Sequence, residues 1–291
     1  MQPRLVKTAD ARTLAVQTFG DPAGRPVFLL HGTPGSRLGP TPRSSVLYNL
    51  GVRLIAFDRP GYGGSDRLRG RQAAAAAADV QAIADDFGLE RVAVVGRSGG
   101  APHALACGAL LPGRVHRVAA LVSLAPWDAE DLDWFGQMAP SNIRDYRAAE
   151  RDHQRIAATM EQRARRIRDD PAELIAGLRR ELSGDDRVVV SDAGIRRMLQ
   201  RNYREAFRQN ADGWIDDALA FTTDWGFKVQ DIAVPTWLWH GAEDMYSPVD
   251  HSRWLASHIP DATLFLEPGA AHFGSLRVLT AAIKWAAGAA G

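Results

Sequence analysis

Cysteine is almost absent from this sequence, and so is any long apolar run. Cys107 is the single cysteine among 291 residues, which excludes an internal disulfide and makes a cysteine-based metal site untenable. No stretch is apolar for long enough to span a bilayer, and the first ten residues lack the apolar core of a secretion signal. We therefore expect a cytoplasmic protein with no membrane partner.

The sequence also lacks an excess of charge of either sign. Lys and Arg number 35, Asp and Glu number 34, and the formal net charge is +1. The overall field therefore gives no reason to expect nucleic acid as a partner. Hydrophobic residues make up 46% and charged residues 24%, as in ordinary globular proteins. We expect a small-molecule substrate, and a homodimer stays open.

Short β-rich segments recur through the first half and return near the end. They cover residues 12–19, 26–30, 52–57, 92–95, 118–124, 236–240 and 262–266. Between them lie segments with helical spacing, such as residues 73–87 and 101–111, each closed by Gly or Pro. Apolar strands that alternate with helices predict a mostly parallel sheet covered by helices on both faces.

Residues 127–230 differ in character from the rest of the chain. They form arginine-, aspartate- and glutamate-rich helical segments without a convincing parallel strand. We therefore predict a core of residues 1–126 and 231–291, interrupted by a helical cap over residues 127–230. Trp127 and Trp225 are candidates for the walls of a substrate pocket, because ligand sites favour apolar surfaces at such seams. The alternative is that they form the small core of the insertion and its seam with the sheet.

The sequence Gly96-Arg97-Ser98-Gly99-Gly100 lies between an apolar strand and a helical segment. A serine on such a tight strand-to-helix turn has a strained backbone, and the residues two before and two after it must be small. Ser98 is therefore the candidate nucleophile. The first amides of the following helix would point toward an anion that develops there.

A serine nucleophile needs a histidine base and a carboxylate that orients it. Asp244 and His272 follow the last two predicted strands, so the chain order is serine, acid, histidine, as expected for this arrangement. We assign His272 as the base and Asp244 as the acid. Glu243 and Asp128 are the competing acids, and the alternative role for these carboxylates is to cap a turn or helix.

The loop that begins His31-Gly32-Thr33-Pro34 follows the strand at residues 26–30. It could bring a backbone amide beside Ser98. We therefore predict an oxyanion hole formed by the N–H groups of Thr33 and Gly99, since this kind of site uses an early loop and the residue after the nucleophile. A Pro-Gly turn without a catalytic part is the alternative.

With these segments the sequence resembles the α/β-hydrolase superfamily, in its capped, esterase-like branch. Residues 58–65, Asp-Arg-Pro-Gly-Tyr-Gly-Gly-Ser, resemble the turn after the fourth strand of that family, where the aspartate and the glycines shape a loop beside the site. The resemblance spans nearly the whole chain. It implies an α/β-hydrolase fold: a mostly parallel eight-stranded sheet with helices on both faces and a helical cap between strands 6 and 7.

The resemblance implies a hydrolase but does not name the substrate. An esterase is expected, with lactone or thioester cleavage close to it. Carbon–carbon bond hydrolases, perhydrolases and iminopeptidases share the layout, although the Gly-Gly-Ser-Trp-Gly motif usual in prolyl iminopeptidases is absent. Epoxide hydrolases and dehalogenases carry Asp where this chain has Ser98. A ligand-binding homologue without catalysis is the alternative of another class.

Two further expectations concern the site. The reaction expected of a Ser, His and Asp set requires no metal ion and no organic cofactor. Arg97 is an unusual neighbour for the nucleophile. It either pairs with an acid such as Asp58 or binds a carboxylate of the substrate.

Overall fold

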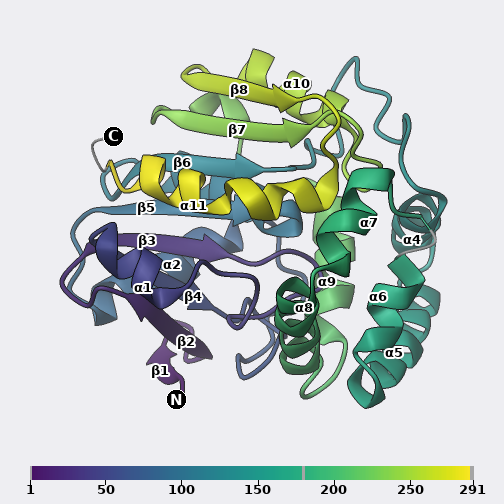
Figure 1. Ribbon diagram of the computed structural model, residues 1–291, viewed down its shortest axis with the longest axis horizontal. Coiled ribbons are helices and arrows are strands. Elements are labelled where there is room, and N and C mark those ends of the chain that lie inside the picture. Colours follow the sequence, from purple (N-terminus) through teal and green to yellow (C-terminus); the bar gives the residue numbers. More distant parts are fainter. Residues whose placement is uncertain (1, 179–180, 289–291) are drawn as a thin grey trace.

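In the computed structural model, which describes residues 2–178 and 181–288, an eight-stranded sheet runs through the centre (Figure 1). Its strand order is β1-β2-β4-β3-β5-β6-β7-β8. The pairs β1–β2 and β2–β4 are antiparallel and the other neighbours are parallel. The strands are β1 (Arg4–Lys7), β2 (Thr13–Gly20), β3 (Arg25–Leu30), β4 (Val52–Phe57), β5 (Val92–Arg97), β6 (Val115–Leu121), β7 (Thr236–Gly241) and β8 (Ala262–Glu267).

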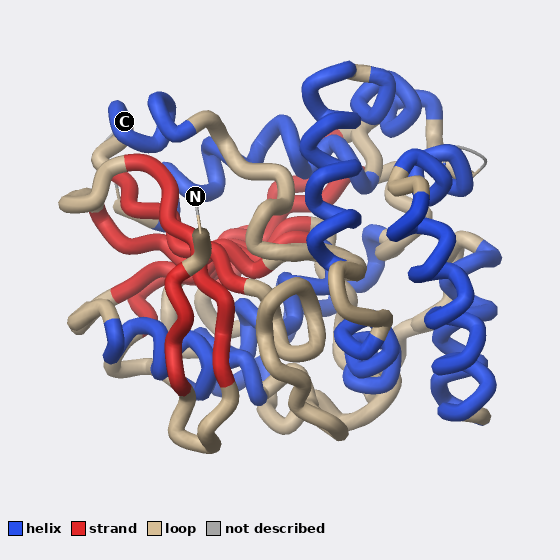
Figure 2. The backbone as a smooth tube through the Cα atoms, turned by 90° about the horizontal axis from the view of Figure 1, so that it is seen from below, coloured by secondary structure: helices blue, strands red, loops and turns tan. Residues whose placement is uncertain are grey.

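Helices cover both faces of the sheet, as the strand pattern predicts (Figures 1 and 2). The core helices are α1 (Ser44–Asn49), α2 (Ala75–Asp86), α3 (Ala101–Leu110), α10 (Val249–His258) and α11 (Ser275–Ala286). Successive residues of β3 point to opposite faces, because side chains alternate along a strand. Phe28 and Leu30 pack with α2 and α3, whereas Val27 and Leu29 pack with α1 and α11. The central strands are therefore apolar on both faces.

In the described part of the chain, six α-helices between β6 and β7 form a separate layer beyond the carboxyl ends of the strands, and we call them the cap helices (Figure 1). They are α4 (Pro140–Arg151), α5 (His153–Asp169), α6 (Ala172–Leu178), α7 (Gly184–Ser191), α8 (Ala193–Ala206) and α9 (Asp212–Phe221). Their inner faces share an apolar cluster that includes Met160, Leu199 and Phe207. The helical content of the predicted insertion is confirmed, and its limits at residues 127 and 230 stay a prediction.

Two strands differ from the sequence expectation. The edge strand β1 was not expected, because only Val6 of its four residues is buried and one buried residue gives no alternating pattern. Strand β6 ends at Leu121, three residues before the predicted end. The chain turns at Val122, whose φ is +48°. The apolar run continues past the turn because Val122 and Leu124 are themselves buried in the loop.

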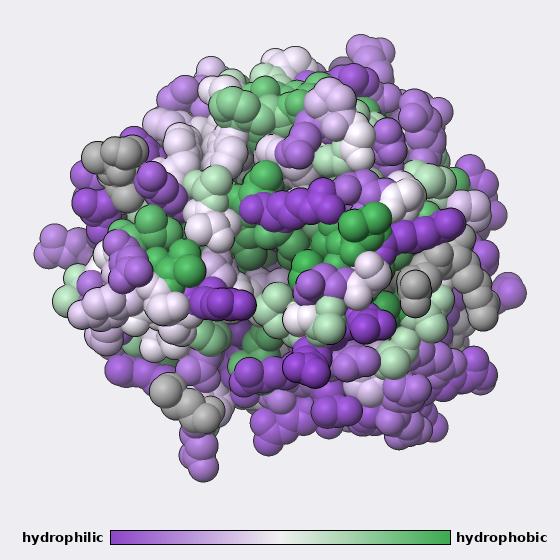
Figure 3. All heavy atoms as spheres, in the orientation of Figure 1, coloured by the Kyte–Doolittle hydropathy of each residue, from purple (hydrophilic) through white to green (hydrophobic). Residues whose placement is uncertain are grey.

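The surface is mostly hydrophilic, with hydrophobic side chains showing along the outer edge strand β8 (Figure 3). Phe265 is 50% exposed there and Leu266 is 38% exposed. The prediction of a possible homodimer is not tested by this exposure. Within residues 2–178 and 181–288, no helix combines the length and the apolar character needed to cross a bilayer.

Candidate active site

Ser98 lies on a sharp turn at the carboxyl end of β5. The turn is the short 3₁₀ segment η1 (Ser98–Gly100), which leads directly into α3. Ser98 has a φ of +54°, a left-handed conformation that costs energy for a residue with a side chain. A Cβ atom on Gly96 would overlap the Gly100 carbonyl, and one on Gly100 would overlap the Leu30 carbonyl. Glycine at both positions lets the strained turn fit between β3 and α3.

Two loops from later strands bring a histidine and a carboxylate to this serine. His272 begins the turn η3 (His272–Gly274) after β8, and Asp244 follows β7. His272 Nε2 lies 3.0 Å from Ser98 Oγ, and His272 Nδ1 lies 2.8 Å from Asp244 Oδ2. The structure thus brings together the three residues that the sequence singles out, although they are widely separated along the chain.

The carboxylate of Asp244 is held in place by its own loop. Its Oδ1 accepts the N–H groups of Tyr246 and Ser247, at 2.7 and 3.0 Å. Burial alone would raise the pKa of Asp244, but His272 and His240 beside it lower the pKa below its usual range. Asp244 therefore stays ionised and can hold the Nδ1–H of His272. The competing acids Glu243 and Asp128 are exposed.

Four other buried histidines near the site have partners of their own. His240, beside Asp244, bonds to Ser252 Oγ at 2.6 Å. His31 Nε2 accepts the Arg59 N–H at 3.1 Å, and burial together with Arg59 lowers the pKa of His31 well below its usual value. His251 Nδ1 accepts the Ala125 N–H at 3.0 Å. His103 bonds to Arg59 at 2.8 Å. These rings hold loops together, which leaves His272 as the imidazole in contact with Ser98.

The loop after β3 lies directly against the serine turn. A Cβ atom on Gly99 would overlap the Thr33 side chain, so the two residues of the predicted oxyanion hole are in close contact. The Thr33 hydroxyl donates a hydrogen bond to Asp217 of cap helix α9. The position of this loop therefore depends on a residue of the cap.

A cavity of about 540 Å³ opens above Ser98 between the cap helices and the strand ends. Its walls include Ser98, His272, Thr33, Gly99 and Arg97 from the core, together with cap side chains such as Met160, Tyr203, Trp214 and Phe221. This size suits a small to medium organic molecule.

Neither tryptophan that we expected at the pocket is among the described residues that line it. Trp225 is 1% exposed and stacks on Phe227 at the seam between cap and sheet. Trp127 packs edge-on against Trp134 and Phe135. The alternative interpretation, that these aromatic residues fill the core at the seam, describes their positions correctly. Trp214 and Phe221, which lie on cap helix α9, do line the cavity.

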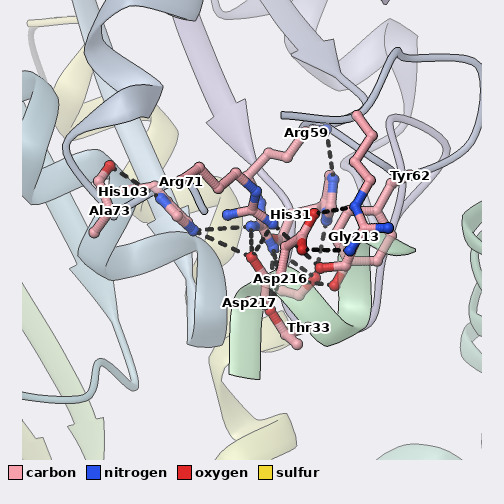
Figure 4. Close-up of polar contacts among 12 residues, drawn as sticks. His31, Thr33, Arg59, Tyr62, Arg71, Ala73, His103, Gly213, Asp216 and Asp217 are labelled. Carbon is pink, nitrogen blue, oxygen red and sulfur yellow. Dashed lines mark hydrogen bonds and ion pairs between the residues drawn. The ribbon is translucent and has the colours of Figure 1, made fainter. Parts of the chain in front are cut away.

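Asp217 is the centre of a buried ionic cluster that the sequence did not indicate (Figure 4). Its carboxylate is fully buried. It accepts hydrogen bonds from Arg59 Nη2 at 2.7 Å, from Arg71 Nη2 at 2.6 Å and from the Tyr62 hydroxyl at 2.7 Å, besides the bond from Thr33. Figure 4 shows these side chains converging on the carboxylate from separate parts of the core.

The charges of this cluster explain why a carboxylate can be buried there. Burial would raise the pKa of Asp217, but Arg59 and Arg71 lower it well below its usual value. His103 completes the contact, with its pKa lowered to about 4 by burial and by Arg59. The neutral ring leaves two arginines and one aspartate as the charges. Sequence reasoning missed Asp217 because Asp216 precedes it on the same helix. Both acids are buried, and only the fold shows that Asp217 binds Arg59 and Arg71 while Asp216 binds Arg67.

Arg97 does not pair with Asp58, which was one of its two expected roles. Asp58 instead binds Arg37 and the Gly64 N–H, the latter at 2.9 Å, and so shapes the loop after β4. Arg97 Nε donates to Ser275 Oγ at 2.7 Å, and Nη2 lies 3.4 Å from the His272 carbonyl oxygen. Its guanidinium thus supports the loop that carries His272.

No group of three or more His, Cys, Asp or Glu side chains among residues 2–178 and 181–288 could hold a metal ion. The single cysteine, Cys107, is buried on α3, and burial raises the pKa of its thiol. Cys107 is therefore a small residue of the core.

The fold is that of the α/β hydrolases, and the comparison with known proteins shows the same. Residues 25–277 match the family model described as the alpha/beta hydrolase fold. The chain therefore belongs to the α/β-hydrolase fold family.

Similar proteins include a non-heme chloroperoxidase from Streptomyces lividans, 29% identical over 92% of both chains. A 2-hydroxymuconate semialdehyde hydrolase from Pseudomonas putida is 28% identical over 83% of this chain and 78% of its own length. The crystal structure of an esterase from Rhodococcus sp. ECU1013 superposes with a TM-score of 0.69 at 19% identity, covering 100% of both chains. At that identity the likeness concerns the fold.

We predict that Asp217→Asn lowers the free energy of unfolding by about 3 kcal/mol or more, because it leaves two buried arginines without their carboxylate. Denaturant unfolding followed by circular dichroism measures the change.

Asp212→Asn is the matched control, since Asp212 lies on the same helix and pairs with Arg67 at 2.5 Å while both side chains remain partly exposed. Its loss should cost about 1 kcal/mol or less. An equal loss in the free energy of unfolding for the two variants would show that the buried cluster stabilises the protein no more than the partly exposed pair does.

Proposed function

We propose that the protein is a serine hydrolase that cleaves an ester, lactone or thioester bond of a small to medium organic substrate. The observation that carries this proposal is the contact of Ser98 Oγ with His272 Nε2, backed by Asp244, at the wall of the cavity. A serine in hydrogen-bond contact with a neutral imidazole can be activated as a nucleophile. The cavity offers the space for an acyl group beside it.

In the proposed cycle His272 takes the proton of Ser98 while the oxygen attacks the substrate carbonyl. The bond between the carbonyl carbon and the leaving oxygen or sulfur then breaks, and His272 gives the proton to the leaving group. Water, activated by the same imidazole, releases the acid from the acyl-enzyme. Asp244 holds the ring and stabilises its charged form. These steps use protein groups and water alone.

The oxyanion of each tetrahedral intermediate is assigned to the N–H groups of Thr33 and Gly99. Gly99 is the second residue of η1, so its N–H is among the initial amides that a helix leaves unpaired. The Thr33 N–H donates to no acceptor in the described part of the chain. Losing one such donor typically lowers the rate by about 10²- to 10³-fold.

A second candidate is another reaction on the same serine, such as carbon–carbon bond hydrolysis or perhydrolysis. This candidate is supported by the similarity to the proteins named 2-hydroxymuconate semialdehyde hydrolase and non-heme chloroperoxidase. The serine and its partners do not distinguish these reactions. A series of p-nitrophenyl esters, assayed beside peracid formation from acetate and hydrogen peroxide, separates ester hydrolysis from perhydrolysis.

We predict that Ser98→Ala lowers kcat by about 10⁴- to 10⁶-fold without loss of folding, because the hydroxyl forms the acyl-enzyme and its removal changes little volume. Hydrolysis of p-nitrophenyl esters measures the rate, and a fluorophosphonate probe with mass spectrometry locates the adduct.

Ser257→Ala is the control, since Ser257 lies exposed on α10 and bonds to its own helix. It should keep both hydrolysis and labelling. Hydrolysis by Ser98→Ala at the wild-type rate would refute the assignment of the nucleophile. A wild-type protein that is not labelled would favour a ligand-binding homologue without catalysis.

We also predict that the acid limb of kcat/KM depends on a single proton. The imidazole must be neutral to accept the Ser98 proton, so the rate rises with pH. The lowered pKa of Asp244 means that this carboxylate does not take up a second proton in the same range. Profiles from about pH 5 to about pH 9 measure the slope. A limb of slope two would contradict an ionised Asp244.

A further inference from the structure

Arg97 places a permanent positive charge in the wall of the cavity, next to the nucleophile. Its guanidinium is fixed by the bonds of Nε and Nη2 to Ser275 Oγ and the His272 carbonyl. The ring of Phe273 lies 5.2 Å from the guanidinium carbon. The side chain is therefore held in one orientation before any substrate arrives.

This charge has no counter-ion among the described residues. No carboxylate oxygen of residues 2–178 and 181–288 comes within 4.0 Å of the Arg97 guanidinium nitrogens, whereas other arginines of the cavity wall are paired. Arg37 binds Asp58 and Glu205, and Arg163 binds Asp145 at 2.6 Å. Arg144 and Arg166 also lie at the wall, but both are exposed to solvent.

The nearest acids, Asp186 and Asp244, form no ion pair with Arg97; burial lowers the pKa of Arg97, and the charges of these two acids oppose that shift from a greater distance. Asp244 accepts the bonds of His272, Tyr246 and Ser247. Asp186 of α7 accepts the Phe273 N–H at 2.6 Å. A half-buried cation without a partner is costly, and such a residue at a ligand cavity indicates that an anion completes it.

The free end of the guanidinium lies beside Gly32, close to the nucleophile. Nη1 makes no hydrogen bond within the described chain. A Cβ atom built on Gly32 would lie 3.3 Å from Ser98 Cβ and 3.6 Å from Arg97 Nη1. Nucleophile and guanidinium tip thus flank the same glycine, which directly precedes Thr33 of the proposed oxyanion hole.

We propose that Arg97 binds a carboxylate on the acyl part of the substrate, so that the preferred substrates are esters or lactones of dicarboxylic acids. This inference rests on the proposed function. The carboxylate keeps its charge throughout, while Ser98 forms and loses the acyl bond as described. Arginine suits this role because its planar N–H groups match the oxygens of a carboxylate. The acyl part stays on Ser98 through both half-reactions, so the contact serves both.

The test compares monomethyl glutarate with the methyl ester of glutaric acid monoamide, which has nearly the same shape but no charge. Methanol release gives kcat/KM for each. We expect the wild-type protein to prefer the carboxylate by about 10- to 100-fold, the range of a charge-assisted hydrogen bond. In Arg97→Met the ratio of the two kcat/KM values should fall to about one. In Arg97→Lys the ratio should lie between that value and the wild-type ratio.

Ser275→Ala is the matched control for the structural role of Arg97. It removes the acceptor of the Arg97 Nε–H but keeps the charge, so it should change both rates alike and leave their ratio near the wild-type value. If Arg97 only supports the His272 loop, Arg97→Met will likewise lower both rates by the same factor. That result would overturn the proposal.

Protection of Ser98 against the fluorophosphonate by the same two compounds gives a second comparison of their binding, which does not depend on measuring methanol release. Equal protection of the wild-type protein would overturn the carboxylate site, and so would a preference lost in Arg166→Met but kept in Arg97→Met. Failure of the proposed function has a different signature. In that case Ser98 is not labelled and no p-nitrophenyl ester is hydrolysed.

Discussion

The buried carboxylate of Asp217 joins the two parts on which the candidate site depends. Its helix belongs to the cap, while Arg59, Tyr62 and Arg71 belong to the core. Thr33 bonds to the same carboxylate. This one cap residue therefore contributes both to the docking of α9 and to the position of the loop to which the oxyanion hole is assigned. Because breaking a buried ion pair is costly, cap and loop are expected to keep this relation as long as the protein is folded.

The serine turn imposes the second constraint. A positive φ at Ser98 requires small neighbours, and the sheet supplies the space only where β5 passes directly into α3. The carboxyl ends of parallel strands meet at one edge of the sheet, so the loops after β3, β7 and β8 converge on the same turn. The order β3-β5-β6-β7-β8 thus places a base and an acid beside a residue far away in sequence.

Much of this arrangement could be predicted from the sequence, because the residues concerned are tied to local patterns. Ser98, Asp244 and His272 each follow a predicted strand, and Gly96 and Gly100 identify the turn. Contacts between the cap and the core have no such local signal. Two adjacent acids, Asp216 and Asp217, look alike in sequence, yet they point about 100° apart around a helix. The prediction that Trp127 and Trp225 line the pocket was wrong for the same reason, because the sequence does not show how side chains pack between cap and core.

Two arginines beside the same loop show why residue type alone does not define a role. Arg59 is neutralised by Asp217 and serves to hold the loop, whereas Arg97 meets only a hydroxyl and a carbonyl. Neutral acceptors orient a guanidinium without cancelling its charge. The field of Arg97 therefore reaches into the cavity, where an anion can be bound more strongly than in water because the surroundings are less polar. The two arginines thus differ by the presence of one carboxylate, which comes from a distant part of the chain.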